Sequence, residues 1–383
     1  MYPALNGTLT GISSLQLDSV TPASPTLLSF VVTANGKARY TVSLSTDTHG
    51  LIGGLRIAPD APAAAASPPP VPASWAGVDG LARSVAPQVR LLVAQVSGAE
   101  GAACRPVHAI DATTAAPLAS SFKLYVLDAL ARAIANGTVS WNQRLTLTAA
   151  DKSLPSGNLQ NDPDGTRVTV RQAADAMISV SDNTAADMLM SLLGRSAVQR
   201  DTTLTGMADP GQDVPFLTTR ELFVLRTHDW PALADHYLAL DAQGREALLA
   251  NTVDRVPLGS LDVAGWTTPR NVGTIEWFAS PDDLCRVLAS LAGLARQPGL
   301  APLSGILADG NGQVRLDPDT WETLWFKGGS DVGALTENYL ATTRSGRTYV
   351  VSLLAENPAA PIPAKAQLTA ASAVEGALAL AAR

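Results

Sequence analysis

The sequence predicts an α+β fold, in which an antiparallel sheet is built from both ends of a large domain and a helical lobe lies between. Three observations support this prediction. Strand-like runs open the domain at 88–96 and 103–110, the middle from 117 onward has mainly helical patterns, and strand-like runs return at 322–326, 334–342 and 348–355. A groove between sheet and lobe is then the expected place for a site.

A proline-rich stretch divides the chain. Residues 59–74 read PDAPAAAASPPPVPAS. Clustered prolines favour extended polyproline conformation and do not enter the interior of a helix or sheet. We therefore expect three parts: a small β-rich domain over 1–58, a semi-rigid linker over 59–74, and the large domain over 75–383.

The small domain contains two clear strand patterns. The runs 27–33 and 38–45 flank Asn35-Gly36, a dipeptide typical of tight β-hairpin turns. Further strands are expected over 9–17 and 51–57. So short a sheet buries little apolar surface by itself. We expect it to pack against the large domain or to pair with another chain.

The large domain has its own boundary signals. Its first two strands flank a glycine-rich turn over 97–101, and an Ala/Leu-rich helix is expected over 363–382. Thr169 and Gln172 form a capping-box pattern that predicts a helix start. The stretch 205–265 contains Trp230 and Tyr237 and is either a lid over the site or a surface insertion.

Composition and charge exclude several classes of function. Of the 383 residues, 46% are hydrophobic and 16% are charged, as in folded globular chains. The net charge is −7, from 27 Lys and Arg against 34 Asp and Glu. No basic stripe is present, so nucleic acid and anionic membranes are not expected partners. No apolar run has the length of a membrane-spanning helix.

Cysteine and histidine usage argues against a metal site. Cys104 and Cys285 lie far apart and form no CxxC pair, which leaves one long-range disulfide open. The four histidines do not pair at metal-ligand spacing, so we expect no metal and no cofactor. The first residues lack a signal-peptide pattern. The compartment and the oligomeric state stay open.

Three motifs carry chemistry. In Ser120-Ser121-Phe122-Lys123, Ser120 and Lys123 are three residues apart at the start of an apolar helix, so their side chains share one face. A serine hydroxyl becomes a nucleophile when a base, such as a lysine with a lowered pKa, takes its proton. A capping serine beside a solvated lysine is the alternative reading of this motif alone.

The second and third motifs follow along the chain. Ser181-Asp182-Asn183 is expected in a tight turn between two helices, where such residues are also common for purely structural reasons. Lys327-Gly328-Gly329-Ser330 follows a strand, and paired glycines let a backbone approach a ligand closely, although a simple turn or bulge has the same pattern.

Taken together, SSFK, SDN and KGG in this order resemble the active-site triplet of class A β-lactamases and penicillin-binding proteins. The segment around Ser280-Pro281 is similar to a helix start of the same family. The resemblance covers residues 75–383. It implies a β-lactamase-like fold, with a five-stranded antiparallel sheet flanked by helices plus a helical lobe.

The resemblance also implies roles for the matching residues. Ser120 would be the acylated nucleophile, Lys123 its base, and Ser181 a proton shuttle to the leaving group. Lys327 would supply positive charge, and the N–H groups of Ser120 and Ser330 would form the oxyanion hole. Asn183, Gly328, Gly329 and Ser330 would bind the substrate.

Two departures from the family are visible. Gly328 stands where the family usually has a Thr or Ser hydroxyl that helps to hold a substrate carboxylate. The stretch 261–270 contains no glutamate to serve as a deacylating base. Glu221 is another candidate, but with Thr218 it forms a capping-box pattern. Glu276 is nearer the helix start, and an exposed surface role is an equal alternative for it.

The small domain and the linker indicate which group within the family the chain resembles. A small cyclase-like domain before a β-lactamase-like domain is similar to a group of actinobacterial serine hydrolases, including the clavulanate-pathway member. We therefore expect a serine hydrolase that cleaves small esters or ester side chains of β-lactams. The alternatives are a class A-type β-lactamase, and a penicillin-binding sensor that is acylated or only binds.

Overall fold

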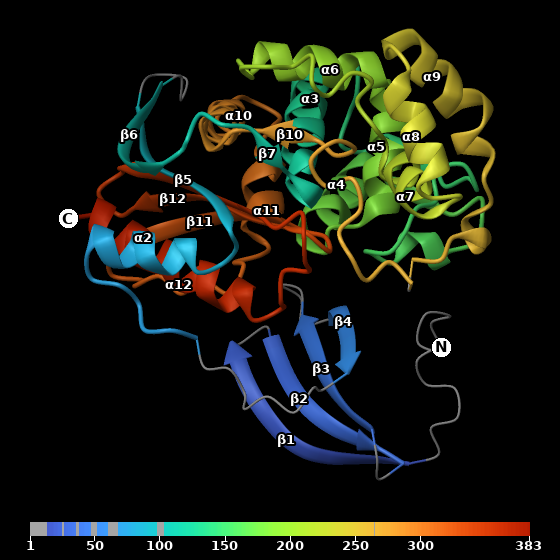
Figure 1. Ribbon diagram of the computed structural model, residues 1–383. Coiled ribbons are helices and arrows are strands. Elements are labelled where there is room, and N and C mark those ends of the chain that lie inside the picture. The colour runs from blue at the N-terminus through green and yellow to red at the C-terminus, as the bar shows by residue number, and fades with distance from the viewer. Residues whose placement is uncertain are drawn as a thin grey trace. The chain divides into compact units, whose positions relative to one another are not determined.

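The computed structural model describes residues 14–24, 27–35, 38–46, 52–59, 68–97, 103–263 and 265–383. The chain forms two compact units, Met1–Ser67 and Pro68–Arg383 (Figure 1). Half of the predicted linker, residues 60–67, lies outside the described residues, as do residues 98–101 of the predicted turn.

In the first unit, four described strands form one antiparallel sheet in the order β1-β2-β3-β4. They are β1 (Leu15–Ser24), β2 (Leu27–Ala34), β3 (Ala38–Thr46) and β4 (Ile52–Pro59). The β2–β3 hairpin is confirmed, and Asn35 adopts a φ of 51°, which asparagine tolerates well. The first strand lies later than predicted, because β1 shares only 15–17 with the run 9–17, and residues 9–13 lie outside the described ones. Pro22 is tolerated in β1 because this strand is at the sheet edge.

The second unit contains the predicted five-stranded antiparallel sheet. Its order is β11-β12-β13-β5-β6, so strands from both ends of the unit meet in one sheet. The strands are β11 (Trp321–Ser330), β12 (Ala334–Thr343), β13 (Thr348–Glu356), β5 (Gln88–Ser97) and β6 (Ala103–Ile110). The KGGS motif was predicted to follow a strand but lies inside β11. Pairing with Glu337 and Thr336 of β12 keeps Gly328 and Gly329 in the strand, and glycine in a strand is typical of a close backbone approach.

Helices cover both faces of this sheet (Figure 1). On one face, α2 (Trp75–Arg83) and α12 (Ala366–Ala381) bury side chains such as Val78 and Val374 against Val93 and Val351. On the other face, α10 (Pro281–Leu294) packs with α3 (Lys123–Ala135) against Leu92 and Val350. Alternate residues of each strand therefore enter two separate cores. The first core lies under α2 and α12, and the second core lies under α10 and α3.

The helical lobe lies beside the sheet (Figure 1), and its helices contribute side chains to the second core. It consists of α4 (Val170–Ser179), α5 (Asn183–Leu193), α6 (Arg195–Leu204), α7 (Thr219–Thr227), α8 (Ala232–Ala239) and α9 (Ala242–Asn251), and α11 (Pro302–Ala308) contacts α4. The predicted capping box of Thr169 and Gln172 is present at α4. Two short ladders complete the unit: β7 (Ala116–Pro117) with β10 (Phe278–Ala279), and β8 (Arg144–Thr146) with β9 (Arg167–Thr169).

The stretch 205–265 is part of the lobe rather than a loose surface insertion. Tyr237 and Trp266 are buried in the second core together with Leu249 and Val253. Trp230 remains 39% exposed and lies against the Arg270 guanidinium. The helices of this stretch are therefore fixed by apolar packing.

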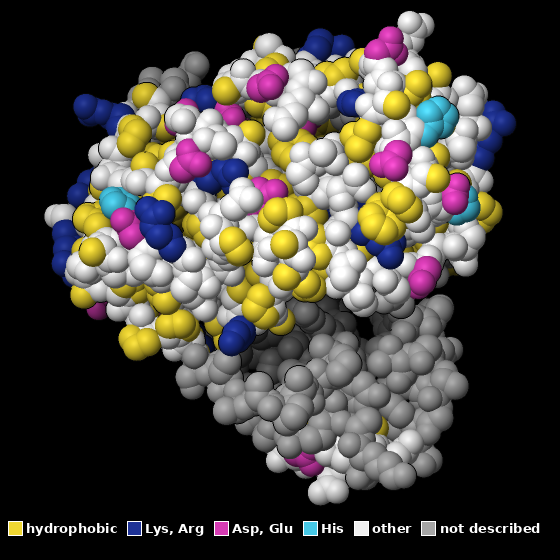
Figure 2. Space-filling model, in the orientation of Figure 1, with side chains coloured by type: hydrophobic (Ala, Val, Ile, Leu, Met, Phe, Trp, Pro, Cys, Tyr) yellow, Lys and Arg dark blue, Asp and Glu magenta, His cyan; other side chains and the backbone are white. Residues whose placement is uncertain are grey.

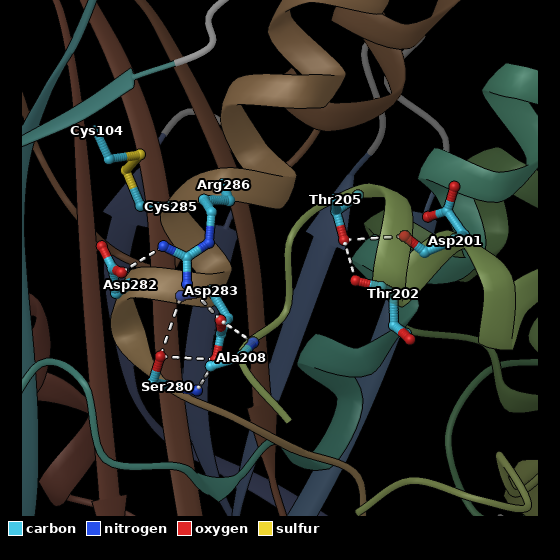
Figure 3. Close-up of polar contacts among 10 residues, drawn as sticks. All are labelled: Cys104, Asp201, Thr202, Thr205, Ala208, Ser280, Asp282, Asp283, Cys285 and Arg286. Carbon is cyan, nitrogen blue, oxygen red and sulfur yellow. Dashed lines mark hydrogen bonds and ion pairs between the residues drawn. A yellow bond between two sulfur atoms is a disulfide. The ribbon is translucent and has the colours of Figure 1, made fainter. Parts of the chain in front are cut away.

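A disulfide joins Cys104 of β6 to Cys285 of α10, which settles the pairing that the sequence left open. Figure 3 shows the neighbouring Arg286 guanidinium reaching both Asp282 and Asp283. Asp283 also caps α10 through Ser280 and accepts the Ala208 N–H at 2.9 Å. The start of α10 is thus held by covalent, capping and ionic contacts.

Acidic and basic side chains are interspersed on the visible face of the second unit (Figure 2). No helix within the described ranges combines the length and the apolar character needed to cross a membrane.

Candidate active site

The first motif forms a tight turn at the entrance to α3. Residues Ala119–Phe122 make one turn of 3-10 helix, and Ala119 adopts a φ of 44° that is unusual for a residue with a Cβ. The Phe122 ring stacks on the Trp277 ring with centroids 3.7 Å apart, and both side chains are buried. This packing holds Ser120 at the mouth of the helix with its side chain half-buried. Residues 118–122 are called the nucleophile turn below, after the role predicted for Ser120.

Lys123 is the centre of the site. Its side chain is fully buried, and its Nζ lies 3.2 Å from the Ser120 Oγ. The same Nζ contacts the Ser181 carbonyl at 2.7 Å, the Ser181 Oγ at 3.0 Å and the Asn183 Oδ1 at 2.6 Å. Two of the predicted motifs are therefore joined through one amine, and the solvated lysine of the alternative reading is wrong.

The surroundings of the two lysines favour neutral amines. Burial, and next the charge of Lys327, hold the pKa of Lys123 well below its ordinary value. Burial also lowers the pKa of Lys327 to about 7, although Glu337 opposes this shift. A neutral amine has a free electron pair, so Lys123 can accept a proton from Ser120.

The SDN turn is fixed through its middle residue. Asp182 caps α5 by accepting the Ala185 N–H at 2.8 Å, and its other oxygen accepts the Asn158 N–H at 2.7 Å. A Cβ on Gly157 would lie 2.1 Å from the Asp182 carboxylate carbon, so only glycine allows this approach. Ser181 has a φ of 55°, which turns its side chain toward Lys123.

Both heteroatoms of the Asn183 side-chain amide make a hydrogen bond. Its Oδ1 accepts from Lys123, and its Nδ2 donates to the Leu154 carbonyl at 2.6 Å. Nδ2 carries two N–H groups, so these contacts leave a second donor that a substrate carbonyl can accept.

The third motif reaches the site from the sheet edge. The Lys327 Nζ lies 3.1 Å from the Ser181 Oγ, so this hydroxyl is between two amines. A Cβ on Gly329 would lie only 2.6 Å from both the Leu118 carbonyl oxygen and the Ser120 nitrogen. The β11 backbone is therefore in direct contact with the backbone of the nucleophile turn, and Gly329 makes that contact possible.

Ladder geometry directs the Ser330 N–H outward. The Asp331 N–H bonds the Ala334 carbonyl at 3.0 Å, and Ser330 is opposite Leu335. Because hydrogen-bonded and non-bonded pairs alternate in an antiparallel ladder, Ser330 is in a non-bonded pair. Its N–H therefore points away from β12, toward the open edge that faces the nucleophile turn.

Gly328 has no room for a side chain. A Cβ there would lie 2.7 Å from the Phe326 ring and 3.0 Å from the Thr336 carbonyl oxygen. The position that carries a hydroxyl in the family is thus closed by an aromatic ring.

Three supporting residues were not found from the sequence. The Ser121 Oγ is 2.6 Å from the Thr336 Oγ1 and accepts from the Asn338 Nδ2 at 2.8 Å. The Thr336 Oγ1 in turn donates to the Leu118 carbonyl at 3.0 Å. These contacts fix the nucleophile turn to β12. Thr336 and Asn338 lie two apart on one face of β12, and that spacing was the available signal.

The candidate deacylating glutamates are occupied elsewhere. Glu221 forms the expected capping box with Thr218, and its two oxygens bind the Arg195 guanidinium. Glu276 is buried, so the exposed surface role is wrong. One of its oxygens lies 3.6 Å from the Arg226 guanidinium, which gives the buried carboxyl a partner. In the part of the chain that the structure describes, no carboxylate makes a hydrogen bond to the Ser120 or Lys123 side chain.

The structure also bears on metal binding. Among the described residues, His, Cys, Asp and Glu side chains do not gather into a group of three or more that could hold a metal ion. The arrangement offers a hydroxyl, two amines with lowered pKa values and an outward N–H group.

Comparison with protein families gives one match. Residues 88–217, which contain the first two motifs, match the model of the family described as Beta-lactamase enzyme family. A search of curated proteins finds no match.

Solved structures with the same fold are numerous. A β-lactamase from Sphaerobacter thermophilus is 20% identical, with a TM-score of 0.56, and the match covers 81% of this chain and 98% of that one. PBP-A is 18% identical, with a TM-score of 0.52, covering 82% and 100%. An ancestral class A β-lactamase is 18% identical, with a TM-score of 0.55, covering 79% and 98%. The predicted β-lactamase-like fold is thereby confirmed.

Proposed function

We propose that this protein is a serine hydrolase that forms an acyl-enzyme on Ser120 and cleaves carboxylic esters, including ester side chains of β-lactams, while it hydrolyses β-lactams slowly. The observation that carries the proposal is the buried Lys123 amine, 3.2 Å from the Ser120 Oγ and with its pKa lowered by burial and by Lys327. Nucleophile and base are within hydrogen-bonding distance, as acyl transfer requires.

In the first half of the reaction, the Ser120 oxygen attacks the ester carbonyl carbon and Lys123 takes the hydroxyl proton. The carbonyl oxygen becomes an oxyanion and accepts the N–H groups of Ser120 and Ser330. The bond to the leaving oxygen then breaks. Ser181, between the Lys123 and Lys327 amines, passes its proton to that oxygen and receives the proton that Lys123 took from Ser120. An alcohol departs, and Lys123 is neutral again.

In the second half, water enters the side that the alcohol has left. Lys123 takes a proton from this water, and the resulting hydroxide attacks the acyl carbon. The bond to the Ser120 oxygen breaks, that oxygen recovers its proton from Lys123, and a carboxylic acid is released. A β-lactam behaves differently because its leaving nitrogen stays tethered and covers the same side.

Two features favour esters over β-lactams. Among the described residues, no carboxylate bonds the Ser120 or Lys123 side chain, so these residues do not hold a base in place for the opposite face. Gly328 brings no hydroxyl for a substrate carboxylate, and Phe326 fills the space where that hydroxyl would be.

The domain division belongs to the same proposal. Residues 1–58 would be a small cyclase-like domain, 59–74 a linker and 75–383 the hydrolase domain, as in the actinobacterial group that the sequence resembles. The substrate would be a small molecule.

A penicillin-binding sensor is the second candidate. The missing carboxylate base favours it, because an acyl-enzyme that water reaches slowly persists. A class A-type β-lactamase requires fast deacylation, which this site does not support.

Intact-protein mass spectrometry tests the proposal. The protein is mixed with p-nitrophenyl acetate, a penicillin and a cephalosporin, and the acyl mass is followed in time. We expect a transient acetyl adduct and fast ester turnover, with a burst and then a slow phase for the penicillin. Permanent adducts with every compound would indicate the sensor. Burst-free penicillin turnover above the ester rate would refute the proposal.

The variants Ser120→Ala and Ser121→Ala form a matched pair for this assay. Ser121 is the adjacent hydroxyl but bonds Thr336 and Asn338 rather than Lys123. The adduct should disappear in the first variant and persist in the second. The reverse result would assign the nucleophile to Ser121 instead of Ser120.

A further inference from the structure

A buried arginine lies behind the site, outside the residues used so far. Arg226 of α7 is 0% exposed. Its Nη1 binds the Asp331 carboxylate and lies 3.6 Å from a Glu276 oxygen, and its guanidinium is 5.4 Å from the Trp266 ring centroid. Burying a guanidinium costs considerable desolvation free energy, so we expect a specific role of Arg226 at this position.

Arg226, Asp331 and Glu276 are called the Arg226 cluster below. Its first acidic residue, Asp331, lies at the end of β11. Asp331 follows Ser330 directly, and its Oδ1 accepts the N–H groups of Gly333 at 2.9 Å and Ala334 at 2.8 Å. Its Oδ2 binds Arg226. Asp331 thus shapes the β11–β12 turn with one oxygen and anchors that turn to α7 with the other. The Ser330 N–H is one residue away.

The second acidic residue of the Arg226 cluster, Glu276, is connected to the nucleophile turn. Glu276 accepts the Trp277 N–H at 2.9 Å, and the Trp277 carbonyl accepts the Leu118 N–H at 2.9 Å. Leu118 begins the turn that carries Ser120, and the Trp277 ring stacks on Phe122 in that same turn. The Ser120 N–H is therefore tied to the Arg226 cluster through a short chain of contacts.

The end of β11 and the turn that carries Ser120 are thus both connected to the Arg226 side chain. We propose that Arg226 is the positioning residue that fixes the separation of the two oxyanion donors, the N–H groups of Ser120 and Ser330. This inference rests on the proposed function, because the two donors matter only if a carbonyl is attacked there. The planar guanidinium suits the role, since it offers several donors in a fixed geometry.

Kinetics on Arg226→Gln tests this assignment. Removal of a whole oxyanion donor typically costs about 10²- to 10³-fold in kcat, so a displaced pair of donors should cost at least about 10-fold, with KM little changed. Arg226→Lys keeps the charge beside Asp331 and should recover part of the loss.

Arg195→Gln is the matched control. Arg195 also bridges to α7, through Glu221, but contacts neither β11 nor the nucleophile turn. It should lower stability without lowering kcat. Equal losses in kcat for both variants would overturn the assignment, because they would indicate a general effect of helix instability. A kcat for Arg226→Gln near that of wild type would overturn it too.

A thiono ester gives a readout specific to the oxyanion donors. Sulfur is a weak hydrogen-bond acceptor, so an intact oxyanion hole favours the oxo ester over its thiono analogue. The ratio of oxo to thiono rates should fall in Arg226→Gln and stay at the wild-type value in Arg195→Gln. An unchanged ratio in Arg226→Gln would contradict the inference. If Arg226→Gln does not fold, Arg226→Lys and Asp331→Asn provide the same comparison.

Hydrogen exchange separates this inference from the proposed function. In Arg226→Gln, the amides of 116–122 and of 327–334 should exchange faster than in wild type, and in Arg195→Gln they should not. This result is independent of any turnover. A wild-type protein without Ser120 acylation would refute the hydrolase, whereas unchanged exchange in both segments would refute the role of Arg226.

Discussion

Gly329→Ala is the sharpest perturbation of this site. The new Cβ would lie 2.6 Å from the Leu118 oxygen and from the Ser120 nitrogen, and 2.8 Å from the Thr336 Oγ1. Ordinary contacts begin near 3.4 Å. The first two atoms belong to backbone that Phe122 and Trp277 hold in place, so β11 itself must move away from the nucleophile turn.

The required shift is about 0.8 Å, the difference between an ordinary contact and the close one. An oxyanion donor works within a range of a few tenths of an ångström, so kcat should fall about 10²-fold or more. Forcing a methyl group into a packed contact should also cost about 1–3 kcal/mol of unfolding free energy.

The assay is steady-state hydrolysis of p-nitrophenyl acetate beside thermal unfolding. Gly80→Ala is the matched control, since an added Cβ on this α2 residue meets no atom within 4 Å. It should keep full activity. A folded Gly329→Ala protein with a kcat within about threefold of wild type would refute the claim that β11 positions the oxyanion donor.

Three further results are expected. Lys123→Ala should reduce single-turnover acylation as much as Ser120→Ala, typically by about 10³-fold or more, and a double variant clearly worse than either would show that the two side chains act independently. Glu276→Gln should become more stable than wild type as the pH rises from 4.5 to about 8. Burial raises the pKa of Glu276 to about 8, Arg226 opposes this shift, and Asp331 and Asp213 lie nearby. The stability that the protonated carboxyl contributes to the wild type is therefore complete below pH 4.5 and is lost as the pH rises through about 8. A difference in melting temperature between the two proteins that is the same at pH 5 and pH 9 would contradict this. Replacing both Cys104 and Cys285 by Ser should lower the unfolding free energy by about 2–5 kcal/mol in urea titrations at unchanged kcat, and an unchanged midpoint would argue against a stabilising disulfide.

Local patterns predicted most of the fold. The strands at 88–96, 103–110, 334–342 and 348–355 were found nearly to the residue, because turn signals bound each apolar run. The end of β11 was missed because Gly328 and Gly329 weaken a strand pattern. Pairing with β12 keeps these residues extended, and that pairing is tertiary information.

The site divides in the same way. Three short motifs and their resemblance to a known triplet predicted Ser120, Lys123, Ser181 and Lys327, and the structure brings these side chains together around two amines. Their catalytic roles stay predictions. Arg226 and Asp331 could not be found because no local rule links α7 to the end of β11. Glu276 was open to an exposed reading since a single carboxylate gives no periodic signal, and its burial depends on a partner from another element.

The sheet topology has a consequence for synthesis on the ribosome. Leu91 pairs with Leu353, and the Gly329 backbone lies close to Ser120, so the serine motif reaches its final surroundings only after β11 and β13 have been synthesised. A nascent chain that ends after α11 contains both SSFK and SDN but neither Lys327 nor the Ser330 N–H. Contacts between such distant residues also form slowly, since a long loop must close first. The proposed hydrolysis therefore requires synthesis beyond β11, and a translation product truncated before that strand would contain Ser120 and Lys123 without Lys327 and the Ser330 N–H.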